Sequence, residues 1–272
     1  MSNNSSQPFS PCGPLRGPLT TGETTELNTL DIGNMEPYLF QGVVLPERAQ
    51  LSLQFALGFS HITSGIAGVA KVSVVLNQVA VWIETDHEWD IFDLRNVVKN
   101  LVQSHLDMVG YLKGYAYDFE VTRVLNRSRG IDYVFGIDIP CLAERGKSLD
   151  LNAELIKLCD KTTGPNGVFL NRCFSDLASA MKHADDTGFY CYRAIESLRH
   201  HCAATHSLSS ADKSTQWEKF REVANCDEKT LRAIKLAADP LRHGEAAGIT
   251  SDDRAALFMQ TWEVVDGYLK NV

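Results

Sequence analysis

The stretch Tyr190–Cys202 carries three side chains whose types and spacing suit phosphate chemistry. An α-helix advances about 100° per residue, so Arg193 and His200 point within roughly 20° of each other, and Glu196 lies between them. Histidine titrates near neutral pH and moves protons, arginine holds a phosphate through two hydrogen bonds, and a carboxylate orients either group. The same pattern also fits a solvated helix face with an ordinary Arg–Glu pair, so both interpretations stand.

A second basic pair, Arg242 and His243, follows later in the chain and stands directly before Gly244. We expect the guanidinium and imidazole groups of the C-terminal half to gather in one solvent-filled cleft. The candidate catalytic residues are therefore Arg193, Glu196, His200, Arg242 and His243.

Several common signatures of enzymes and metal sites are missing from the sequence. There is no P-loop, GxGxxG, HExxH, GxSxG or CxxC pair, which argues against the common nucleotide hydrolases, Rossmann enzymes, zincins and α/β-hydrolases. Histidines and cysteines near His200 supply the ligand types of zinc, but their spacing matches no known zinc finger. Neighbouring His200 and His201 point about 100° apart on a helix, so both rarely reach one ion. We therefore expect no metal and no cofactor.

The elements that must position these residues are helices. From Asp150 onward the apolar residues recur at helical spacing, as in the predicted helix Phe169–Ala184 and in the 4, 3, 4 series Phe258, Trp262, Val265 and Leu269. Helices of this kind bury one face each, and a bundle satisfies all of them together. The sequence predicts an all-α bundle over residues 150–272.

The first half alternates between strand and helix periodicity. Residues 27–145 are expected to form a domain of mainly antiparallel sheet with one helix, so the whole chain is predicted to be α+β. Residues 142–149 read as a short polar connector, and the Ser-, Pro- and Gly-rich residues 1–26 as a flexible tail. The predicted strands and helix are Tyr38–Leu45, Gln50–Phe59, Lys71–Ile83 (one long strand or two short ones), Asp90–Gly110, Tyr115–Leu125 and Tyr133–Ile139.

Charge, cysteine usage and hydropathy set further bounds on the class of protein. The 272 residues carry a formal net charge of -8, so any contact with nucleic acid must be local or use a basic cleft of a dimer. The chain has seven cysteines, an odd number with no CxxC spacing, so we expect reduced thiols and no framework of disulfides. No segment approaches the ~20 apolar residues of a membrane span, and no secretory signal pattern opens the chain. We expect a cytoplasmic protein that does not enter a membrane.

The region from about Val168 to Leu269 resembles the HEPN superfamily of small helical-bundle domains. The segment Tyr192–Glu196 looks like a helix with the pattern Y-R-A-x-E seen in that superfamily. Arg193 and His200 match a loose Arg-to-His spacing, and Ala238–Gly244 is similar to the late R-N-x-x-x-H-G segment. One departure is that Arg242 and His243 are adjacent, so the well-spaced pair lies on the earlier helix instead.

The resemblance implies two alternative functions. Active members cut RNA without a metal: the 2′-OH attacks, a histidine assists proton transfer and an arginine stabilises charge on the phosphate. This implies an endoribonuclease, in a stress or phage-defence system, that forms a homodimer, binds RNA and uses its N-terminal domain as a sensor for a protein partner. The alternative is a non-catalytic interaction or regulatory protein that uses the bundle for dimerisation or partner binding.

Overall fold

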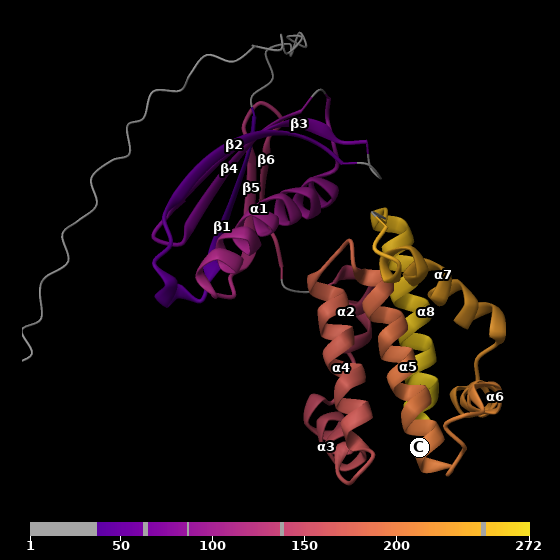
Figure 1. Ribbon diagram of the computed structural model, residues 1–272. Helices are drawn as coiled ribbons and strands as arrows, with labels where there is room; N and C mark the ends of the chain where they lie inside the picture. Colours follow the sequence, from indigo (N-terminus) through magenta and orange to yellow (C-terminus); the bar gives the residue numbers. More distant parts are fainter. Residues whose placement is uncertain (1–36, 62–64, 86, 137–138, 246–248) are drawn as a thin grey trace, which may run out of the picture. The chain divides into compact units, whose positions relative to one another are not determined.

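The computed structural model describes residues 37–61, 65–85, 87–136, 139–245 and 249–272. A six-stranded antiparallel sheet with one long helix is followed by a helical half (Figure 1). The predicted α+β class is therefore confirmed. The expected tail, residues 1–26, lies outside the described residues.

The sheet has the strand order β2-β3-β4-β1-β5-β6, and every neighbouring pair is antiparallel. A single turn of 3-10 helix, Glu47–Ala49, follows the first strand. The strands are β1 (Tyr38–Leu45), β2 (Leu53–Ser60), β3 (Ala67–Val75), β4 (Gln78–Thr85), β5 (Asp118–Asn126) and β6 (Ile131–Val134).

The segment Lys71–Ile83, predicted as one long strand or two short ones, folds as parts of two strands, β3 and β4, joined by a hairpin turn. Leu76 and Asn77 occupy the turn with φ of 46° and 70°, and asparagine tolerates this left-handed region better than most residues. The buried Asn77 amide donates to the carbonyl oxygens of Val44 at 3.0 Å and Pro46 at 3.1 Å. The turn residue thus ties the hairpin to the end of β1.

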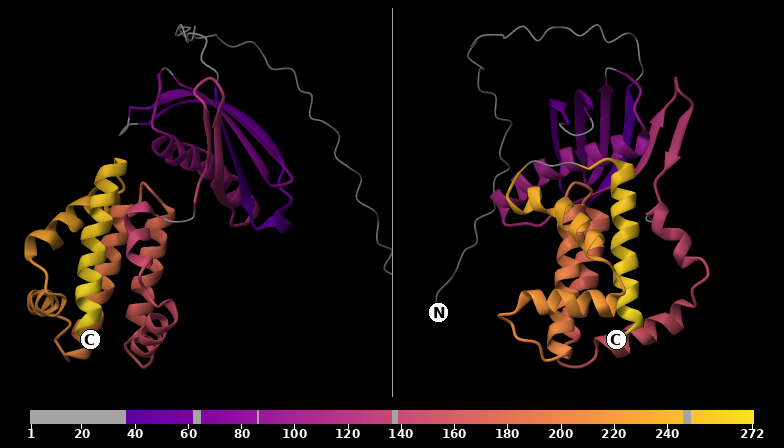
Figure 2. Two further views of the ribbon diagram at one scale, coloured as in Figure 1. Left: turned by 180° about the vertical axis from the view of Figure 1, so that it is seen from behind. Right: turned by 90° about the vertical axis from the view of Figure 1, so that its right-hand side faces the viewer.

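Helix α1 (Ile91–Lys113) covers one face of the sheet (Figures 1 and 2). The Asp90 side chain accepts from the backbone N–H groups of Phe92 and Asp93 and so caps the N-terminus of the helix. One stripe of the helix is apolar and packs on the inward residues of the strands. The buried members of this stripe are Leu94, Val97, Val98, Val102 and Leu106.

The helical half contains α2 (Pro140–Gly146), α3 (Leu151–Thr162), α4 (Gly167–Lys182), α5 (Thr187–Thr205), α6 (Lys213–Ala224), α7 (Glu228–Arg242) and α8 (Ser251–Lys270). Helix α2 corrects the expectation of a connector over residues 142–149. Pro140 suits the first turn of a helix, and Arg145 forms an ion pair with Asp266 of α8. The polar composition of this segment concealed a helix that tertiary contacts hold in place.

Helix α5 is the central element of the bundle and packs against α4, α6, α7 and α8 (Figure 2). The cores of these helices form one apolar cluster that includes Leu170, Ile195, Phe220 and Phe258. Asp227 and Thr250 cap α7 and α8. Helix α6 is capped by Asp212. None of the described helices combines the length and the apolar character that crossing a membrane needs.

The buried pair His201 and Tyr268 makes the stability of the bundle depend on pH. His201 Nδ1 lies 2.7 Å from the Tyr268 hydroxyl, and burial lowers the pKa of His201. The unfolded chain therefore binds more protons than the folded one, so stability is lost as pH falls below about 6.5. Urea denaturation across pH 5 to 8 should show this loss for the wild type and a smaller one for His201→Asn. Parallel pH profiles for the two proteins would contradict it.

Candidate functional site

The predicted site residues on α5 share one side of the helix but contact different partners. Arg193 points to α4, where its Nη2 lies 3.2 Å from Asp176 Oδ1, and its guanidinium lies over the ring of Phe189 at 5.3 Å. Asp176 is buried, its second carboxylate oxygen has no hydrogen-bond partner among the described residues, and burial raises its pKa. Arg193 is thus engaged in a partly buried ion pair between α4 and α5.

Arg242 and His243, the second predicted basic pair, also have different surroundings. The guanidinium of Arg242 lies over the ring of Tyr192 at 5.2 Å and forms an ion pair with Asp239 at 3.3 Å. This contact brings the end of α7 to the N-terminal half of α5. His243 is exposed directly after α7, and its imidazole makes no hydrogen bond or ion pair with another described residue.

Arg199, which the sequence analysis did not single out, lies beside the predicted His200. The residue is only 5% exposed. Its Nη1 donates to Gln216 Oε1, its Nη2 lies 2.9 Å from His200 Nε2, and the guanidinium lies over the Trp217 ring at 5.1 Å. Its Nε is buried without a hydrogen-bond partner in the part of the chain that the structure describes. A permanent positive charge is therefore buried against neutral acceptors only.

The contact with Arg199 determines which nitrogen of His200 carries the proton. A guanidinium can only donate hydrogen bonds, so His200 Nε2 must accept. The neutral imidazole then carries its hydrogen on Nδ1 and acts as a donor there. Phe169 stacks on the imidazole with ring centroids 5.9 Å apart. The free lone pair that a general base needs is already occupied in this arrangement.

One cationic side chain contacts this imidazole and two more act on it electrostatically. Burial is the main cause that lowers the pKa of His200, and the charge of Arg199 is the second. Arg172 and Lys213 lower this pKa further, whereas Glu196 raises it. Arg172 and Lys213 are exposed, and no described carboxylate forms an ion pair with Arg172, Arg199 or Lys213. We call Arg172, Arg199, His200 and Lys213 the Arg199 cluster. Its parts come from α4, α5 and the start of α6, and its local charge is positive although the chain is acidic.

A signal for Arg199 was present in the sequence. On α5 it lies at helical spacing from Ile195, Cys202 and Ala203, which are all apolar and buried. A charged residue inside an apolar stripe needs partners when the stripe is buried. The partners themselves, Gln216 and Trp217, could not be found this way because they belong to another helix.

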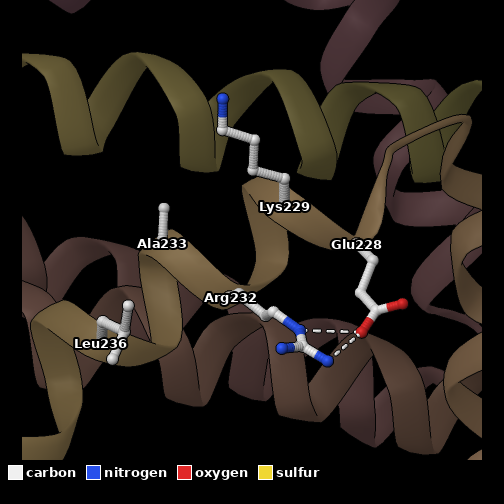
Figure 3. Close-up of a pocket in the computed structure, with 5 residues that line it drawn as sticks. All are labelled: Glu228, Lys229, Arg232, Ala233 and Leu236. Carbon is white, nitrogen blue, oxygen red and sulfur yellow. Dashed lines mark hydrogen bonds and ion pairs between the residues drawn. The ribbon is translucent and has the colours of Figure 1, made fainter.

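A shallow, open hollow lies elsewhere in the bundle, along the outer side of α7 (Figure 3). Its lining is Glu228, Lys229, Arg232, Ala233 and Leu236. Arg232 turns to Glu228, with 2.5 Å between Nη2 and Oε1, so this charge is already compensated. None of the predicted site residues lines it. Across the described ranges, no three His, Cys, Asp or Glu side chains gather closely enough to hold a metal ion.

The fold and the site together define a protein with a helical bundle that carries a local basic cluster and follows an α+β domain. Two models of one family match the chain: the N-terminal domain of DUF8168, a domain of unknown function, over residues 38–135, and its C-terminal domain over residues 155–272. Together they cover more than half of the sequence, so the chain belongs to the DUF8168 family. Comparisons with curated proteins and with solved structures find no match.

The resemblance to the HEPN superfamily is wrong. The family models that match belong to DUF8168, and none belongs to HEPN. The spacing of Arg193 and His200 arises on any helix that carries the two residues seven positions apart. In the structure Arg193 pairs with Asp176 and His200 with Arg199, so no described hydrogen bond or ion pair joins the two predicted residues.

Proposed function

We propose that this protein is a non-catalytic interaction protein whose helical bundle binds RNA at the Arg199 cluster. The observation that carries the proposal is the buried guanidinium of Arg199, which meets neutral acceptors and no described carboxylate. A buried charge without a counter-charge costs free energy, and a bound phosphate compensates it. The exposed Arg172 and Lys213 extend the positive charge to the surface, where a polyanion can approach.

The state of His200 favours binding over cleavage. RNA cleavage without a metal needs a base to take the 2′-OH proton, and a neutral histidine serves when one of its nitrogens has a free lone pair. Here Nε2 accepts from Arg199 and Nδ1 carries the hydrogen. A ribonuclease that used His200 would first have to break the contact with Arg199.

Binding can be measured by the fluorescence anisotropy of a short, labelled single-stranded RNA. We expect Arg172→Gln/Lys213→Gln to weaken binding at least about tenfold, and the slope of log affinity against log salt to fall by about 1.4, because two phosphate charges are no longer neutralised. The matched control, Lys229→Gln/Arg232→Gln, removes the same charges from the hollow on α7. Equal affinities of the two double variants would contradict the proposal.

The same RNA can be followed on a gel to separate binding from cleavage. We expect it to stay intact after prolonged incubation with the wild type. Cleavage that disappears in His200→Asn and in His243→Ala would instead establish the ribonuclease alternative. A role in antiviral defence has no further support and remains a prediction.

The cysteines support a reducing compartment as the location. Cys173, Cys191 and Cys202 are buried free thiols in the bundle core, and burial raises the pKa of each. Such thiols behave as small apolar residues and persist unpaired where thiols stay reduced. We propose the cytoplasm on this ground. The homodimer and a protein partner for the sheet domain remain predictions that light scattering and cross-linking would test.

A further inference from the structure

The charges of the Arg199 cluster exceed what an internal phosphate of RNA can balance. Arg172, Arg199 and Lys213 supply three positive charges, and none forms an ion pair with a described carboxylate, although the charge of Arg172 also acts on the buried carboxylate of Asp176. Glu196 acts in the opposite direction and raises the pKa of His200. A phosphodiester has one negative charge and two free oxygens. A phosphate monoester has close to two charges at pH 7 and three terminal oxygens, each a strong acceptor.

The donors of the cluster suit such a group. Because Nε2 of His200 accepts from Arg199, the Nδ1–H of the exposed imidazole is available to donate outward. The exposed Arg172 side chain offers a guanidinium fork, and the exposed Lys213 side chain a compact charge. Arg199 is nine-tenths buried, its Nη2 donates to Nε2 of the imidazole, and after burial its charge is the next cause that lowers the pKa of His200.

The local backbone adds to this preference. Phe169 and Arg172 lie in the first two turns of α4, a helix of 16 residues. The residue before this helix, Asn166, makes no hydrogen bond from its side chain to the N-terminal N–H groups. The side chain of Asn166 therefore leaves the positive end of the helix dipole without a cap, which favours an anion near the start of α4.

We propose that the Arg199 cluster recognises a terminal phosphate monoester, the 5′-phosphate end of the bound RNA, in preference to internal phosphodiesters. This inference rests on the proposed function, which names RNA as the partner. It goes further because it predicts that the affinity depends on the 5′-phosphate end of the RNA strand and not on the length of the strand.

The direct test compares the 5′-phosphate and 5′-hydroxyl forms of one RNA in the anisotropy assay. We expect the 5′-phosphate form to bind at least tenfold more tightly to the wild type and the two forms to bind equally to Lys213→Gln. Lys229→Gln, which changes the hollow on α7, should keep the preference. Equal binding of the two forms to the wild type overturns the inference but leaves the RNA-binding proposal intact. A preference that survives in Lys213→Gln also overturns it, because the phosphate is then held elsewhere.

A second measurement does not depend on RNA. Inorganic phosphate added to the full chain should shift the imidazole nitrogen resonances of His200 in NMR spectra and raise the pKa of that histidine, because a dianion stabilises the imidazolium. The resonance is assigned by its loss in His200→Asn. If phosphate moves the resonance but no RNA binds, the inference on the ligand class survives while RNA as the partner fails. Unmoved His200 signals at saturating phosphate overturn the inference.

Discussion

Replacing Arg254 with methionine is expected to lower the free energy of unfolding of the bundle by about 2–4 kcal/mol, because three buried or partly buried acceptors lose their donor. Arg254 lies on α8 and is 9% exposed. Its Nε donates to Thr187 Oγ1 at 2.8 Å, and its Nη2 lies 3.1 and 2.9 Å from the carbonyl oxygens of Ala180 and Met181. The two carbonyls belong to the end of α4, where helical partners are missing.

Methionine keeps the apolar stem that packs in the bundle, so the change isolates the guanidinium. The guanidinium is still charged at neutral pH, although burial lowers the pKa of Arg254 to about 10. Urea denaturation followed by circular dichroism measures the loss. Arg232→Met is the matched control, since Arg232 is exposed and paired within α7, and it should change little. A variant Arg254→Met as stable as this control would show that the carbonyls of α4 find other partners.

Replacing Gly188 with alanine is the second change with a large expected effect. A Cβ at this position of α5 would lie 2.3 Å from the carbonyl oxygen of Ala237 on α7 and 2.7 Å from its carbonyl carbon. Alanine is favoured over glycine inside a helix by about 1 kcal/mol, but a clash with backbone costs more than this gain. We expect a net loss of about 2 kcal/mol, because α7 must move away from α5.

The displacement of α7 gives Gly188→Ala a signature besides stability. Arg242 at the end of α7 lies over Tyr192 of α5, and this contact should weaken when the helices separate. Gly146→Ala is the control, because a Cβ on Gly146 of α2 meets nothing within 4 Å. Denaturation curves report the stability, and the ring resonances of Tyr192 report the contact. Unchanged values of both in Gly188→Ala would mean that the two helices are not packed this closely.

Most of the secondary structure could be predicted because its determinants are local. The alternation of Val79, Val81 and Ile83 fixes the inward face of β4, and the caps Asp90 and Thr250 act within three residues of their partners. Helix α2 was missed for the opposite reason. Its segment is short and polar, and its stability depends on contacts with α8, which is more than a hundred residues away in the sequence.

The candidate site could likewise be predicted only where its features depend on residues close together in the sequence. By itself the sequence determined that Arg193, Glu196 and His200 share one side of a helix, since helix geometry requires only the spacing of the residues. Only the tertiary structure decided their partners, because Asp176 comes from α4 and Tyr192 meets an arginine from α7. It also placed Arg199, which looked like an ordinary charged residue, against Gln216 of α6 and the imidazole of His200. The surroundings of a charged side chain determine what it can interact with, and for these residues the surroundings come from helices far apart in the chain.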